Sequence, residues 1–166
     1  MITARCYDHR VPHPSSTSRV PFLLSQLGSI AADSFASKTA GIGLSPNEAG
    51  VLRLLAREPG MSQRALSHRL GTQPSRMVAL IDTLESAGLL TRARSAADRR
   101  NYELHLTDAG IATMNSLRQV SEANEAALLG GLEPAEREAL AVLLTKLAAS
   151  LELDADVHPG SSGGVR

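Results

Sequence analysis

Aromatic residues and cysteine are scarce in this sequence. Its 166 residues include two Tyr, two Phe and no Trp, which argues against a single-strand binder that stacks bases on aromatic rings. The one cysteine, Cys6, excludes an internal disulfide and fits a reducing compartment such as the cytoplasm. The core must therefore be built mostly from Leu, Ala, Ile and Val, a composition that suits helices.

Long apolar runs are also missing. No uninterrupted stretch approaches the roughly 20 residues that a membrane-spanning helix needs. The first residues do not contain the apolar segment of a secretory signal. We therefore expect a cytoplasmic protein with no membrane partner.

Charge is balanced overall but unevenly distributed. The formal net charge is +0, yet residues 45–107 contain nine Arg and no Lys against six acidic residues. Residues 108–166 contain four basic and nine acidic residues. Arg can bind a phosphate or a guanine edge through two parallel hydrogen bonds. The excess is small, so charge alone does not establish nucleic-acid binding.

The chain predicts one domain of helices and a hairpin between two tails. Residues 1–18 and 154–166 are rich in Pro, Ser and Gly and are expected to be flexible. Within the single domain 19–153, hydrophobic periodicity and capping signals predict helices over about 21–39, 46–57, 62–70, 73–87, 108–129 and 134–151.

Local signals define the middle of the domain. Ser45-Pro46-Asn47-Glu48 reads as a capping box with Pro at the first helical position, and the helix that follows is expected to bury Ala49, Leu52, Leu55 and Ala56. Ser62 and Thr107 read as further N-caps. Residues 89–94 and 102–106 alternate apolar and polar side chains around the polar loop 95–101, as hairpin strands do.

The expected fold class is mainly α (α+β), a winged helix-turn-helix. The lobe 45–107 contains the whole winged module, which leaves the Leu- and Ala-rich helices in 19–40 and 108–153 outside it. The simplest use for their apolar surface is a dimer interface.

The start of the fourth helix is the candidate base-reading segment. A helix fits the DNA major groove and presents its N-terminal side chains to base edges. Here these are Thr72, Gln73, Pro74, Ser75 and Arg76, and Ser62, Gln63 and Arg64 open the preceding helix in the same way. The alternative is that residues 72–76 merely cap a core helix.

The hairpin supplies the second candidate contact. Arg94 opens the basic segment, and Asp98, Arg99 and Arg100 lie near its tip. An Arg there suits a narrow minor groove, where the potential is most negative. Asp98 would repel phosphate, so we expect it to pair with a nearby Arg and fix the loop.

Four segments together resemble the MarR family of bacterial regulators. They are Ser62-Gln63-Arg64-Ala65-Leu66-Ser67-His68-Arg69-Leu70-Gly71, Leu84-Glu85-Ser86-Ala87-Gly88-Leu89-Leu90, Asp98-Arg99-Arg100 and Leu104-His105-Leu106-Thr107-Asp108-Ala109-Gly110. The resemblance covers about 20–152. It implies a homodimer that binds double-stranded DNA at a palindromic promoter site, with relief by a small-molecule effector, often phenolic or lipophilic, or by oxidation.

The resemblance also assigns positions and shows departures. It places 73–76 on the recognition helix, Arg100 at the wing-tip minor-groove position and Asp98 as its supporting carboxylate. Many members carry an Arg where this chain has Ala79, and Asp-Pro-Arg where it has 95–97, Ser-Ala-Ala. Base reading therefore rests more on Gln73 and Arg76.

Two rival interpretations remain open. Cys6, His9 and His13 have a metal-like spacing, but three ligands in a Pro/Ser-rich tail are a weak signal, so we expect no metal and no cofactor. A redox or metal sensor acting through Cys6 is one alternative, and a winged-helix protein-interaction module is the other. The sequence has no convincing catalytic triad, phosphate loop or carboxylate pair, so an enzyme is not expected.

Overall fold

The computed structural model describes residues 19–94 and 102–153. Six helices and two strands follow one another along the chain. They are α1 (Arg19–Ala40), α2 (Pro46–Arg57), α3 (Gln63–Arg69), α4 (Pro74–Ser86), β1 (Leu90–Arg94), β2 (Tyr102–Leu106), α5 (Asp108–Leu128) and α6 (Pro134–Ser150). The mainly helical winged helix-turn-helix class is confirmed.

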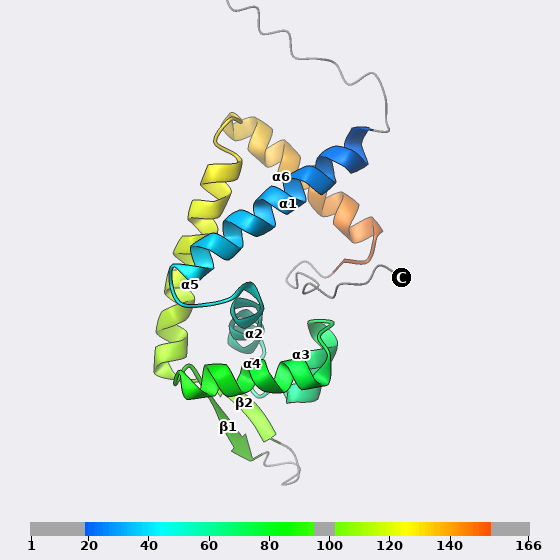
Figure 1. Ribbon diagram of the computed structural model, residues 1–166. Helices are drawn as coiled ribbons and strands as arrows, with labels where there is room; N and C mark the ends of the chain where they lie inside the picture. The colour runs from blue at the N-terminus through cyan, green and yellow to red at the C-terminus, as the bar shows by residue number, and fades with distance from the viewer. Residues whose placement is uncertain (1–18, 95–101, 154–166) are drawn as a thin grey trace, which may run out of the picture.

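The elements form a lobe below a frame of three helices. In Figure 1, α2, α3, α4 and the hairpin make up the lower lobe, and α5 runs from it up to α6. α1 crosses the upper part and packs on both α5 and α2. Lys38 Nζ reaches Asn124 Oδ1 over 3.5 Å, which joins the end of α1 to α5.

The helix starts carry the predicted caps. The Ser45 hydroxyl accepts from the Glu48 N–H, and the Glu48 carboxylate accepts from the Ser45 N–H over 2.7 Å, which completes the capping box. The Thr107 hydroxyl accepts from the Gly110 N–H over 3.1 Å. These contacts satisfy backbone donors that the helices themselves leave unpaired.

The core lies where α2 meets α4, α5 and β2. α2 buries Ala49, Val51, Leu52, Leu54 and Leu55, whereas Ala56 is exposed. The expected burial of Ala56 was wrong, because the last turn of α2 directs Leu54 and Leu55 into the core and leaves Ala56 and Arg57 exposed. The rest of the core comes from Leu44, Leu66, Leu70, Met77, Ile81, Leu84, Leu90, Leu104 and Leu117.

The predicted hairpin is present as an antiparallel pair of strands. Leu90 lies opposite Leu106, and Arg94 lies opposite Tyr102. β2 is also bridged on its other side, where Leu104 pairs with Met61.

No helix of the described ranges is both long and apolar enough to cross a membrane.

Candidate nucleic-acid interface

Buried polar contacts fix the turn between α3 and α4. The Ser67 side chain is buried and its hydroxyl donates to the Thr72 carbonyl over 2.6 Å, while the Thr72 N–H donates back to the Ser67 carbonyl. Gly71 provides the positive φ of 59° that the turn requires. The angle between the two helices is therefore held by residues in the turn itself.

The N-terminal end of α4 is open to solvent. Gln73, Pro74, Ser75 and Arg76 are all exposed, and the N-cap residue Gln73 makes no side-chain cap hydrogen bond. The helices α2, α3 and α5 are instead capped by their own Ser or Thr side chains. The first N–H groups of α4 thus remain available to an external acceptor such as a phosphate.

Thr72 has a different position from its neighbours. It is half-buried, and its hydroxyl donates to the Leu70 carbonyl over 3.3 Å. Its side chain therefore supports the turn, while Gln73, Ser75 and Arg76 project from the start of α4.

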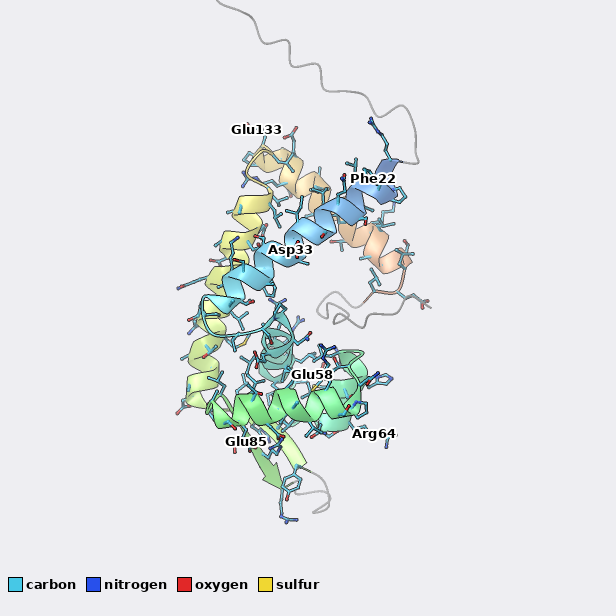
Figure 2. The ribbon with its side chains drawn as sticks, viewed as in Figure 1. Phe22, Asp33, Glu58, Arg64, Glu85 and Glu133 are labelled. Carbon is cyan, nitrogen blue, oxygen red and sulfur yellow. The ribbon has the colours of Figure 1, made fainter. Side chains whose placement is uncertain are left out.

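At the start of α3, the three residues predicted to contact DNA also differ in their exposure and hydrogen bonding. The Ser62 hydroxyl accepts from the Ala65 N–H over 3.2 Å, and Gln63 is half-buried. Arg64 is exposed and lies at the outer end of the helix-turn-helix (Figure 2). Neither Arg64 nor Arg76 forms an ion pair with another residue of the described ranges, which leaves both cations available to phosphates or bases.

The root of the wing is ordered by a cross-strand pair. The Arg94 guanidinium lies 5.4 Å from the centroid of the Tyr102 ring, within cation–π range. Asp98, Arg99 and Arg100 lie outside the described residues, as do Cys6, His9 and His13. Their assigned roles therefore stay predictions.

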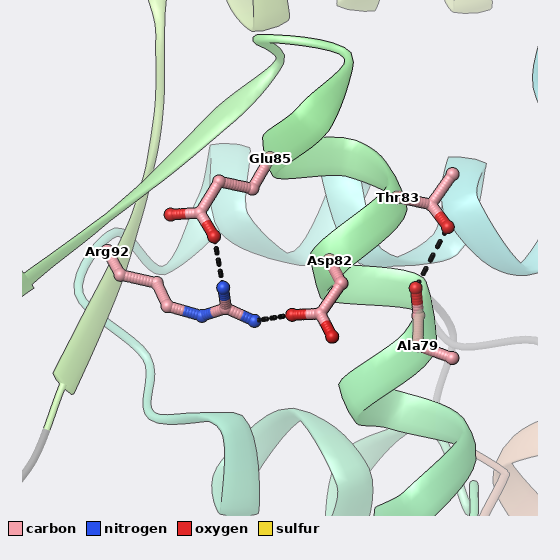
Figure 3. Close-up of polar contacts among 5 residues, drawn as sticks. All are labelled: Ala79, Asp82, Thr83, Glu85 and Arg92. Carbon is pink, nitrogen blue, oxygen red and sulfur yellow. Dashed lines mark hydrogen bonds and ion pairs between the residues drawn. The ribbon is translucent and has the colours of Figure 1, made fainter.

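One interaction at this surface was missed by sequence reasoning. Arg92 of β1 forms ion pairs with both Asp82 and Glu85 of α4 (Figure 3). A signal was present: Leu90, Arg92 and Arg94 share one face of the strand, and an i, i+3 pair of carboxylates shares one face of a helix. What the sequence did not reveal is that these faces meet.

The two histidines of the described ranges lie on α3 and β2. His68 is exposed on α3, and His105 Nε2 lies 3.6 Å from Glu103 Oε2. Within the described ranges, no group of three or more His, Cys, Asp or Glu could hold a metal ion.

This arrangement has counterparts among known proteins. A model of the MarR family matches residues 42–101. The chain is 32% identical to the transcriptional repressor CouR, solved bound to a 23-mer DNA duplex, with a TM-score of 0.68 over 78% of this chain and 92% of that one. The chain belongs to the MarR family.

Two further relatives bear on this assignment. The Thauera aromatica putative transcriptional regulatory protein for the hcr operon is 34% identical over 105 residues, 63% of each chain. This match thus spans less than two thirds of that relative's length. The Mycobacterium tuberculosis MarR family protein Rv2887, solved with p-aminosalicylic acid, is 26% identical with a TM-score of 0.66, covering 78% of this chain and 98% of that one. These relatives are named as regulators, so the expectation of a MarR-family regulator rather than an enzyme is confirmed at the level of the family.

Proposed function

We propose that this MarR-family chain is a sequence-specific DNA-binding repressor that acts as a homodimer and releases DNA when a small effector binds. The observation that carries the proposal is the open N-terminal end of α4, where Gln73, Ser75 and Arg76 are exposed and the N-cap residue Gln73 makes no side-chain cap hydrogen bond. A major groove admits this end of a helix, with Gln suited to adenine and Arg to guanine.

The wing completes the proposed contact with DNA. In a two-fold dimer, the two α4 helices would enter successive major grooves about 34–36 Å apart. The hairpin roots at Arg94 would direct the 95–101 loops, with Arg100, toward the flanking minor grooves. A palindromic promoter site follows from the two-fold symmetry.

Exposed apolar surface on the terminal helices supports a homodimer. α6 buries none of its residues, and α1 buries only Thr39. The exposed large apolar side chains of these helices and the residues after α6 are Val20, Phe22, Leu23, Leu24, Leu27, Ile30, Val142, Leu143, Leu144, Leu147, Leu151 and Leu153. So much apolar surface on these helices is typical of a protein–protein interface.

The test of DNA binding uses the full chain on duplexes from its own upstream region and on a randomised duplex library. We expect tight, salt-dependent binding with a palindromic preference. Arg76→Ala should lose discrimination at one base position per half-site, about 1–3 kcal/mol. Arg118→Ala is the matched control, because Arg118 is an exposed Arg paired with Glu122 on α5.

Other outcomes assign the chain differently. Weak binding without sequence preference would favour a protein-interaction module instead of a repressor. A uniform loss for all sequences in Arg76→Ala would make Arg76 a phosphate contact rather than a base contact.

The effector is proposed to be a phenolic or aromatic carboxylic acid. The support is that Rv2887 was solved with p-aminosalicylic acid and with salicylic acid, and also in complex with DNA. A ligand can release DNA only if it binds one spacing of the two DNA-binding lobes better than the other. Titrating salicylate and p-aminosalicylate into the preformed DNA complex tests this, and affinity unchanged at saturating ligand would contradict the proposal for this class.

A further inference from the structure

Arg92 joins the wing to the helix that is proposed to read DNA. Its guanidinium reaches Glu85 through Nη1 and Asp82 through Nη2, so that two nitrogens bind two separate carboxylates (Figure 3). The Arg92 side chain is 24% exposed, less than either partner, at 56% for Asp82 and 37% for Glu85. Arg92 is therefore the side chain of this cluster that is best shielded from water.

The two carboxylates lie where α4 alone would disfavour them. Asp82 and Glu85 lie in the C-terminal half of the helix, where the helix dipole repels negative charge, and the last turn of α4 contains no basic residue. The compensating cation comes from β1 instead. The cluster is therefore a contact between two elements and not a local feature of the helix.

On the α4 side, β1 is held by the buried Leu90 at its start and by the Arg92 cluster further along. Two strands by themselves are marginally stable in water. β2 is bridged on its far side by the Met61–Leu104 pair, whereas β2 is the only described strand that pairs with β1. Leu90, Arg92 and Arg94 share one face of β1: Leu90 enters the core, Arg94 is exposed and lies over Tyr102, and Arg92 provides a polar contact to α4 between these ends.

We propose that Arg92 is a positioning residue that sets the angle of the wing relative to α4, and so determines whether wing and α4 can engage one DNA site together. The inference rests on the proposed function. Two acceptors on separate residues fix the plane of a guanidinium, which a Lys ammonium, as a point charge, would not reproduce. Losing that fixed plane lets the hairpin pivot about residues 88–90, where β1 begins, at the end opposite to Arg94.

The first test measures amide hydrogen exchange in the full chain without DNA, comparing Arg92→Gln and Arg92→Lys with the wild type. Exchange in β1 and β2 should become roughly tenfold faster in both variants, with α2 and α4 unchanged. Arg118→Gln, which removes a surface ion pair on α5, is the control and should leave hairpin exchange as it is. Equal hairpin exchange in Arg92→Gln and wild type would overturn the inference, whether or not the chain binds DNA.

The second test separates position from charge on DNA. Arg92→Gln removes one positive charge, and the double variant Asp82→Asn, Glu85→Gln removes two negative charges. A pure charge effect predicts weaker DNA binding for the first and tighter binding for the second. A positioning role predicts that both lose hydroxyl-radical protection of the flanking minor grooves while protection at the central contacts remains.

The outcomes also separate this inference from the proposed function. If the wild type binds DNA and both variants keep full flanking protection, the positioning role is wrong and the repressor proposal stands. If the wild type does not bind duplex DNA at any salt concentration, the repressor proposal fails, and the exchange experiment still decides whether Arg92 holds the hairpin.

Discussion

The lobe and the terminal helices bury their apolar residues to very different extents. α2 buries five of its 12 residues, whereas none of the 17 residues of α6 is buried although Leu and Ala dominate its sequence. The core of the lobe is therefore packed within one chain, with Leu117 of α5 contributing to it. The terminal helices have apolar surface that a single chain does not cover, which is the physical basis for expecting a second copy.

The largest expected effect comes from the lobe core. Leu52 is fully buried in α2, so Leu52→Ala should lower the free energy of unfolding by about 2–5 kcal/mol through lost burial and the cavity left behind. Chemical denaturation monitored by circular dichroism measures this. The loss should be the same at every protein concentration, and a loss below about 1 kcal/mol would mean that the core relaxes around the gap.

A substitution on α6 should behave in the opposite way. Leu143 is 64% exposed, so Leu143→Asp should cost little within one chain but should weaken dimerisation by about 2 kcal/mol or more if a partner covers it. Sedimentation equilibrium should show monomers where the wild type is dimeric, and the melting temperature should lose its dependence on protein concentration. An unchanged dimer would place the interface elsewhere on α1 or α6.

The joint between the two regions is tightly packed at Gly110. A Cβ at this position would lie 2.0 Å from the Leu89 carbonyl oxygen, so Gly110→Ala must displace the start of α5 from the turn before β1. We expect about 1–3 kcal/mol of destabilisation in thermal or chemical unfolding. Gly28→Ala in α1 is the control of opposite sign: nothing lies within 4 Å of its Cβ position, and Ala favours a helix by about 0.8–1 kcal/mol. Destabilisation by Gly28→Ala would instead show that a partner packs there.

The features that the sequence predicted correctly are those set by residues close together in the chain. Ser45, Ser62 and Thr107 were readable as caps because each contact spans only three residues, and the hairpin was readable from alternation. The Arg92 cluster was not readable, because it depends on how a strand and a helix are oriented after folding. The prediction for Ala56 was wrong for a related reason, since periodicity gives the face of a helix but not how wide a part of that face other elements cover.

For the candidate site, the sequence predicted the start of α4 as the exposed end. It did not predict which of its side chains are free to contact DNA and which support the turn. Gln73, Ser75 and Arg76 have the accessibility that DNA contact needs, whereas Thr72 is engaged in the turn. That difference depends on backbone geometry at Gly71, which composition does not show. Ser67 was missed because a Ser on a helix is ordinarily a surface residue, and here its hydroxyl is needed by the Thr72 carbonyl.

A smaller effect is expected at the cap of α2. Removing the Ser45 hydroxyl by Ser45→Ala leaves the Glu48 N–H without its acceptor and weakens the capping box. The free energy of unfolding should fall by about 1 kcal/mol, as measured by denaturant titration. No loss would indicate that water or the Glu48 side chain alone satisfies the start of the helix.

The smallest expected effect on stability is at the corresponding position of α4. Gln73 makes no side-chain cap hydrogen bond and is exposed, so Gln73→Ala should change the free energy of unfolding by less than about 0.5 kcal/mol. DNA affinity should nevertheless fall, because a Gln at the start of α4 can bind adenine with two hydrogen bonds and Ala cannot. Denaturation and duplex titration on the same preparations measure the two quantities. A stability loss as large as that of Ser45→Ala, with DNA affinity retained, would make the start of α4 an ordinary cap and remove the contrast on which the base-reading assignment rests.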